Sequence, residues 1–143
     1  MSTQGALIDG HTFRWLCRAR DFAASHLDQP ITVRVLARQA ALSQWHFHRL
    51  FTAAFGQTPH EFMSLMRLQK AKRLLASDSA SVTEICLETG FSSLGSFSSW
   101  FRNNSGLAPS IYRLEIRRVF GAATPWRSTF IPTCFLAAFR SLK

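Results

Sequence analysis

Apolar residues recur at the spacing of one helical face in two stretches of the chain, about fifty residues apart. Residues three and four positions apart lie on the same side of an α-helix. The first stretch has Phe47, Leu50, Phe51 and Ala54, and the second has Phe97, Trp100 and Phe101. A glycine that can end a helix follows each, at Gly56 and Gly106. No alternating strand pattern competes with them, so the sequence predicts an all-α protein.

A shorter helical segment precedes each stretch, which gives two copies of a helix-turn-helix unit. In the first copy, Thr32 is expected to cap a helix that ends near Ala40, and Ser43 to cap the next helix. In the second copy, Ser81 and Glu84 have the spacing of a capping box. Matching features in the same order at this long period indicate two copies of one supersecondary unit.

A longer helix is expected between the two copies. Thr58, Pro59 and Glu61 give its start, through a cap, a proline at the first helical position and an acid at the third. Its apolar side is predicted from Phe62, Leu65, Leu68, Ala71 and Leu75. At about 1.5 Å per residue it measures about 27 Å, slightly less than one turn of B-DNA.

The remaining helices complete one module. A helix over about 12–26 precedes the first copy, and a last short helix begins at Pro109. The predicted module covers residues 10–116. It has a first unit at about 10–57, a linking helix at 58–76 and a second unit at 77–116, flanked by an N-terminal extension (1–9) and an apolar-basic tail (117–143).

The charge is strongly positive and unevenly distributed. The 143 residues carry a formal net charge of +9, which argues for a polyanionic partner. Residues 30–80 contribute +5, residues 116–143 contribute +5, and residues 81–115 contribute −1. The first helix-turn-helix unit, the linking helix and the tail therefore supply the excess.

Several classes of protein are disfavoured. No apolar run reaches the roughly 18 residues that span a bilayer, and no signal peptide is visible, so no membrane partner is expected. Cys17, Cys86 and Cys134 lie far apart without metal-ligand spacing. His46 and His48 diverge on a helix, which argues against a metal site there. The sequence predicts no metal, no cofactor and no enzymatic activity, in a cytoplasmic (nucleoid-associated) protein.

The ordered motifs resemble the DNA-binding domain of the AraC/XylS transcription regulators over about residues 10–116. The matching positions are Leu36, Ala37, Leu42, Ser43, Phe47, His48, Arg49, Leu50, Phe51, Gly56, Gln57, Thr58, Pro59, Arg67, Ala71, Leu74, Leu75, Ile85, Gly90, Phe91, Phe97, Phe101, Gly106, Pro109, Tyr112 and Arg113. The resemblance implies seven helices and recognition helices at about 43–55 and 94–105. Because only nine residues precede the module, the chain is similar to the small stand-alone members. Relatives that repair alkylated DNA carry a four-cysteine zinc domain, which this chain lacks.

Two positions depart from the family pattern. The family usually has glycine in the first turn, where this chain has Ala41. If that turn needs a positive φ, alanine costs on the order of 1 kcal/mol. The second recognition helix has only glycine and serine at its outward positions, and serine reads bases permissively.

Candidate base contacts lie near the start of each recognition helix. They are Gln44, Trp45, His48 and Arg49 in the first, and Gly95, Ser96 and Ser99 in the second. Resemblance places Trp45, His48 and Arg49 at base-contacting positions. Arg49 can bond both O6 and N7 of guanine, and Gln44 can bond adenine or phosphate. As alternatives, Trp45 packs on a neighbouring helix, His48 is solvated, or Arg49 contacts only phosphate.

Candidate phosphate contacts are the arginines and lysines on the flanking helices. They are Arg34, Arg38, Arg67, Lys70, Arg73, Arg102 and Arg113. The stripe on the linking helix could instead be solvated surface, and Arg67 could tie the two units together. The first unit is expected to read sequence, while the second mostly positions the protein.

The sequence therefore predicts a sequence-specific transcription regulator, an activator that binds double-stranded DNA as a monomer with its recognition helices in successive major grooves. RNA polymerase is the expected protein partner. The alternative is an interaction module that binds polymerase or another partner and touches DNA weakly. The tail is interpreted as a flap on the module, a partner-binding or self-association segment, or a membrane-surface anchor without a clear polar face.

Overall fold

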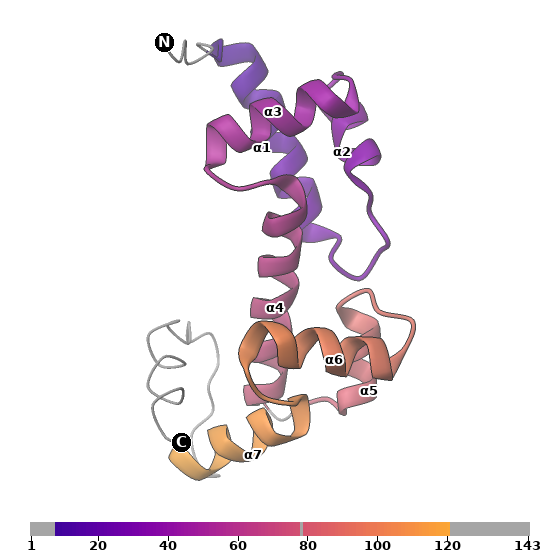
Figure 1. Ribbon diagram of the computed structural model, residues 1–143, viewed down its shortest axis with the longest axis vertical. Helices are drawn as coiled ribbons and strands as arrows, with labels where there is room; N and C mark the ends of the chain where they lie inside the picture. Colours follow the sequence, from indigo (N-terminus) through magenta and orange to yellow (C-terminus); the bar gives the residue numbers. More distant parts are fainter. Residues whose placement is uncertain (1–7, 78, 121–143) are drawn as a thin grey trace. The chain divides into compact units, whose positions relative to one another are not determined.

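The computed structural model describes residues 8–77 and 79–120, and in these ranges the protein is helical without strands (Figure 1). The helices are α1 (Gly10–Ser25), α2 (Val33–Gln39), α3 (Gln44–Phe55), α4 (Pro59–Ser77), α5 (Val82–Glu88), α6 (Leu94–Ser105) and α7 (Pro109–Phe120). For the described residues, the all-α prediction with seven helices is confirmed. The chain divides into two compact units between Met66 and Arg67, inside α4. None of the helices in the described ranges is both long enough and apolar enough to cross a bilayer.

The predicted helix starts rest on hydrogen bonds that their sequences specify. The Ser43 hydroxyl accepts from the backbone N–H of His46 at 3.2 Å. Ser81 and Glu84 form a complete capping box at the start of α5. Thr32 is the exception, because it occupies the N-cap position of α2 without a side-chain capping bond. Its predicted position is confirmed, and its predicted bond is wrong.

Two helices extend further than their sequences indicate. Helix α1 begins at Gly10, because the Asp9 carboxylate accepts hydrogen bonds from the backbone N–H groups of His11 and Thr12 at 2.9 Å. Helix α7 continues to Phe120 and so enters the segment interpreted as tail. The interpretations of the tail from residue 121 onward lie outside the described residues.

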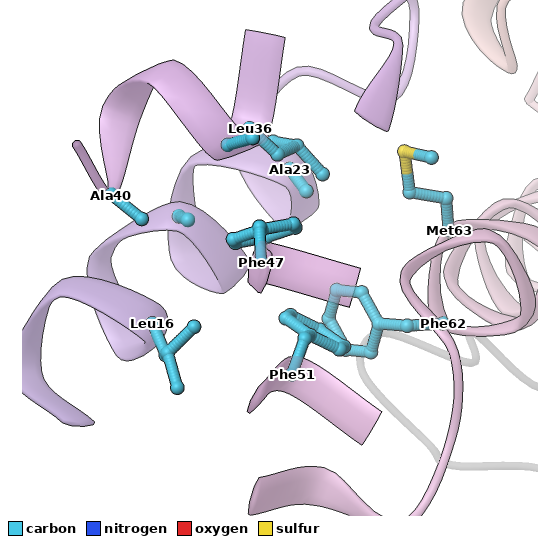
Figure 2. Close-up of a cluster of buried hydrophobic side chains, with 10 residues drawn as sticks. Leu16, Ala23, Leu36, Ala40, Phe47, Phe51, Phe62 and Met63 are labelled. Carbon is cyan, nitrogen blue, oxygen red and sulfur yellow. The ribbon is translucent and has the colours of Figure 1, made fainter. Parts of the chain in front are cut away.

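The core of the first unit is built from α1, α2, α3 and the beginning of α4. Its buried residues are Leu16, Ala19, Ala23, Leu36, Ala37, Ala40, Phe47, Phe51, Phe62 and Met63. Figure 2 shows Phe51 and Phe62 side by side in this cluster. Their ring centroids are 5.8 Å apart in an edge arrangement, and Phe51 meets Phe55 at 4.6 Å. Edge contacts of this kind add to the area that the rings bury.

The core of the second unit repeats the arrangement with the rest of α4 and with α5, α6 and α7. Its buried residues are Leu68, Ala71, Leu75, Ile85, Cys86, Phe97, Phe101, Tyr112 and Ile116. Phe101 packs edge-on to Tyr112 at 5.5 Å, and burial raises the pKa of Tyr112 to about 12. The sequence predicts Leu65 on the buried side of α4, but its side chain is 41% exposed. Met63 and Met66 contact the first core instead, which leaves Leu65 outside the buried stripe.

The turns inside the two helix-turn-helix units share one backbone conformation. Ala41 has φ = 54°, and Gly90 at the matching place has φ = 82°. The next N–H in each turn reaches back to the preceding helix, from Leu42 to the Ala37 carbonyl and from Phe91 to the Cys86 carbonyl, both at 3.0 Å. The first turn therefore needs the left-handed conformation, and it holds an alanine there.

Replacing Ala41 with glycine is expected to raise the free energy of unfolding by about 1 kcal/mol, because glycine adopts a positive φ without a Cβ clash. Chemical denaturation measures this change. Ala53→Gly is the matched control, because Ala53 is exposed inside α3 and should lose about 1 kcal/mol. A loss of stability at both positions would contradict the strain at Ala41.

Candidate nucleic-acid interface

The solvent face of α3 carries the four side chains predicted to contact bases. Phe47 and Phe51 are fully buried, which fixes the opposite side of the helix toward solvent. Gln44, Trp45, His48 and Arg49 are all exposed there. Trp45 is 67% exposed, so its interpretation as an anchor packed on a neighbouring helix is wrong. The structure thus brings the four candidates together on one face.

Trp45 and Arg49 form a pair on that face. The guanidinium carbon of Arg49 lies 4.5 Å from the centroid of the Trp45 ring. Contacts between a cation and an aromatic ring at exposed sites contribute about 0.5–1 kcal/mol. The indole thus restrains the direction of the guanidinium while leaving its donors in solvent. The spacing of four residues is visible in the sequence, although sequence reasoning treated the two side chains separately.

His48 lies beside the beginning of α4. Hydrogen bonds from the backbone and side chain of Thr58 lower the pKa of the Glu61 carboxyl, and the charge of His48 lowers it further. The Thr58 N–H to Glu61 Oε2 distance is 2.8 Å. Glu61 therefore caps α4 and offers His48 a negative neighbour. Within the described residues, no three His, Cys, Asp or Glu side chains gather as metal ligands would.

The beginning of the solvent face of α6 carries small, uncharged side chains, whereas the matching part of α3 is aromatic and basic. Gly95, Ser96 and Ser99 are exposed as expected, opposite the buried Phe97 and Phe101. The nearest atom to a Cβ built on Gly95 is the Ser93 hydroxyl at 3.8 Å, so a larger side chain would fit there. The beginning of this face therefore offers hydroxyl groups, and its positive charge comes only later in the helix, from Arg102.

The seven candidate phosphate contacts fall into two groups. Four side chains are exposed on their helices, namely Arg34 and Arg38 on α2, Arg73 on α4 and Arg102 on α6. The other three are at least partly buried, namely Arg67, Lys70 and Arg113. Contact with phosphate stays a prediction for all seven.

Lys70 and Arg113 make contacts within the second unit. The Lys70 ammonium donates to the Glu88 carbonyl at 2.7 Å, and it lies 3.9 Å from the Glu88 carboxylate. Arg113 donates to the Ala80 carbonyl. Burial lowers the pKa of Arg67, which is consistent with a side chain partly withdrawn from solvent. Sequence spacing did not reveal these contacts, because their partners lie far away along the chain.

Sequence reasoning also missed a group of side chains on α1. His11, Arg14, Trp15 and Arg18 line a shallow hollow on the surface of the first unit. The available signal was their spacing, which puts all four on adjoining positions of one helical side.

Comparison with known proteins assigns the family. Two helix-turn-helix units, each with an exposed second helix, define the class of helix-turn-helix DNA-binding domains. A family model described as a helix-turn-helix domain matches residues 36–115. The chain belongs to this family, in its AraC-type form.

The relatives include named transcription regulators. The chain is 36% identical over 97 residues to the probable transcriptional regulator LumQ of Photobacterium leiognathi, covering 68% of this chain and 39% of LumQ. It is 32% identical over 88 residues to the regulatory protein SoxS of Salmonella typhimurium, covering 62% of this chain and 82% of SoxS. The matched region thus spans less than half the length of LumQ.

A solved structure shares both fold and sequence features. The DNA-binding domain of AdpA, described as a global transcriptional factor in complex with a target DNA, superposes with a TM-score of 0.72 at 29% identity. The match covers 76% of this chain and 98% of that domain. The arrangement of the described helices is therefore that of an AraC-type DNA-binding domain.

Replacing Arg113 with methionine is expected to lower the free energy of unfolding by about 2 kcal/mol, because the Ala80 carbonyl loses a charged donor. Arg118→Met on the same helix is the control. Its side chain is 79% exposed and lies 3.9 Å from Glu115, so removing it should change stability by less than about 1 kcal/mol. Equal effects in urea denaturation would show that the Arg113 contact does not stabilise the unit.

Proposed function

We propose that this chain is a sequence-specific, double-stranded DNA-binding transcription regulator in which α3 reads base edges. The exposed Trp45–Arg49 pair carries the proposal. In a helix-turn-helix unit the second helix enters the major groove and its N-terminal residues contact bases. Arg49 would bond O6 and N7 of a guanine, while the indole contacts a thymine methyl or a sugar. Gln44 and His48 extend the same contact face.

Helix α6 would act as the second, more permissive recognition helix. Gly95, Ser96 and Ser99 present no long side chain, so contacts with bases would be short and weakly selective. The two recognition helices would occupy successive major grooves of one asymmetric site. The DNA-binding domain of AdpA, which has the same fold, is described in complex with a target DNA, and this supports DNA binding by the present chain.

Phosphate contacts would hold the domain in register. Arg34 and Arg38 lie on α2, the helix that crosses the DNA backbone in this motif, and Arg73 and Arg102 are also exposed. The three partly buried side chains would have to share or leave their present contacts in order to reach phosphate. These side chains are Arg67, Lys70 and Arg113. The seven candidate phosphate contacts therefore comprise exposed arginines, which can contact DNA directly, and partly buried side chains, which also stabilise the protein.

The proposal extends to the oligomeric state, the mode of regulation and the place of action of the protein. The chain would bind as a monomer, because each domain already holds two reading units, and it would activate transcription by contacting RNA polymerase. The name of SoxS as a regulatory protein is consistent with that role. The place of action would be the nucleoid of the cytoplasm.

Selection of bound sequences from random DNA tests the function directly. We expect one enriched sequence containing a guanine that Arg49 specifies, and a footprint of about 20 base pairs, two turns of the duplex. About six phosphate contacts give a log–log salt slope near −5. Arg49→Ala should relax the preference at that guanine and lower discrimination by about 1–3 kcal/mol.

Ser99→Ala is the matched control on α6 and should change the preference little. Binding without an enriched sequence, with a slope near −1, would refute the two-groove regulator and favour the weak-binding interaction module. Loss of preference from Ser99→Ala but not from Arg49→Ala would reverse the proposed division between the units.

The Trp45–Arg49 pair predicts a coupling between the two side chains on DNA. Trp45→Phe keeps an aromatic face for the guanidinium, whereas Trp45→Leu removes it. We expect Leu to weaken guanine discrimination more than Phe. In a double-mutant cycle, Trp45→Leu should cost less in the Arg49→Ala background, by about 0.5–1 kcal/mol. Strictly additive effects would mean that Trp45 contacts DNA without positioning Arg49.

A further inference from the structure

The hollow on α1 is formed by one aromatic and three basic side chains. The indole N–H of Trp15 donates to Nε2 of His11 at 3.2 Å, and the two rings meet edge-on. The Arg18 guanidinium carbon lies 5.0 Å from the centroid of the same indole. Arg14 completes the lining. The indole is half-buried against the first core, which gives the hollow a fixed wall.

The positive charge of the hollow is not neutralised within the described part of the chain. No carboxylate of the described residues pairs with Arg14 or Arg18, although Arg20 on the same helix pairs with Asp21 at 2.9 Å. The Asp9 carboxylate accepts from the start of α1 and from the Thr12 hydroxyl. Arg14 and Arg18 lie four residues apart, where like charges repel along a helix. An anion bound between them would relieve that repulsion.

The hollow and the proposed DNA-reading surface lie on different helices of the first unit. Leu16 marks the buried side of α1, and Arg14 and Arg18 each lie two residues from it, about 160° away around the helix. Helix α3 buries Phe47 in the same core and turns Trp45 outward on its other side. The two exposed faces thus point away from one shared core. The hollow therefore shares no side chain with α3, so a partner other than DNA could occupy it.

We propose that this hollow binds an acidic segment of a partner protein. One glutamate or aspartate carboxylate would sit between the guanidinium groups of Arg14 and Arg18, each of which can offer two parallel N–H donors. The apolar stem of that side chain would pack on Trp15. Tryptophan and arginine are the residues most enriched at energetic centres of protein interfaces. The site goes beyond base reading and would allow contact with a protein while the chain is bound to DNA.

The test measures binding of a fluorescein-labelled glutamate–leucine peptide to the full chain, alone and on its selected DNA, by anisotropy. We expect the Arg14→Ala/Arg18→Ala variant to lose about tenfold or more in peptide affinity and to keep its DNA affinity within about twofold. Arg34→Ala/Arg38→Ala removes the same charge from the exposed face of α2. It should weaken DNA binding but leave peptide binding within about twofold.

A second measurement reports on the site itself. Peptide addition should shift the indole N–H resonance of Trp15, identified by its loss in Trp15→Phe, more than the resonance of Trp45. Failure to bind the peptide, equal loss of peptide binding in both double variants, or displacement of the peptide by DNA would overturn the proposal. A drop in DNA affinity from Arg14→Ala/Arg18→Ala would also overturn it, because the hollow would then be a DNA contact. Peptide binding to the chain alone remains measurable even if the proposed DNA function fails.

Discussion

Burial of two phenylalanines four residues apart determines which face each second helix presents to solvent. Phe47 and Phe51 are fully buried on α3, and Phe97 and Phe101 on α6. Because an α-helix has 3.6 residues per turn, these anchors force the residues two positions away to the outside. Everything proposed about DNA reading depends on this constraint, because it selects which side chains can meet the groove.

The same constraint explains why the two units share a scaffold but differ in surface chemistry. The outward positions Trp45 and Arg49 correspond, fifty residues later, to Gly95 and Ser99. The buried phenylalanines and the left-handed turns are retained in both units, since losing them would cost packing or backbone energy. These two outward positions carry no such cost, so one unit has an aromatic–guanidinium pair where the other has a glycine and a serine.

The fold followed from local signals, while several contacts of the candidate site did not. Caps such as Ser81 with Glu84 and the helical spacing of Phe47 and Phe51 act over one or two turns, so the sequence contains all their partners. Lys70 finds its acceptor on Glu88, and Arg113 finds its acceptor on Ala80, across distances that only tertiary packing sets. Leu65 shows the same limit. Which of the neighbouring apolar residues of α4 becomes buried depends on the core that this part of the helix contacts, and local spacing does not specify that contact.

The formal net charge of +9 therefore overstates the positive charge that is accessible to a polyanionic partner. The Lys70 ammonium already contacts the carboxylate and the carbonyl of Glu88, and Arg113 donates a hydrogen bond to a backbone carbonyl. In the first unit, exposed arginines lie on α2 and α3 and on the outer side of α1, and the second unit has others on α4, α6 and α7. The arginines on α2 and α3 would add to a single DNA-facing field, because their side chains flank one recognition surface. The charge on α1 lies opposite the buried Leu16 of that helix and beside the half-buried Trp15, and this combination of arginine with an aromatic ring is better matched to a separate acidic partner.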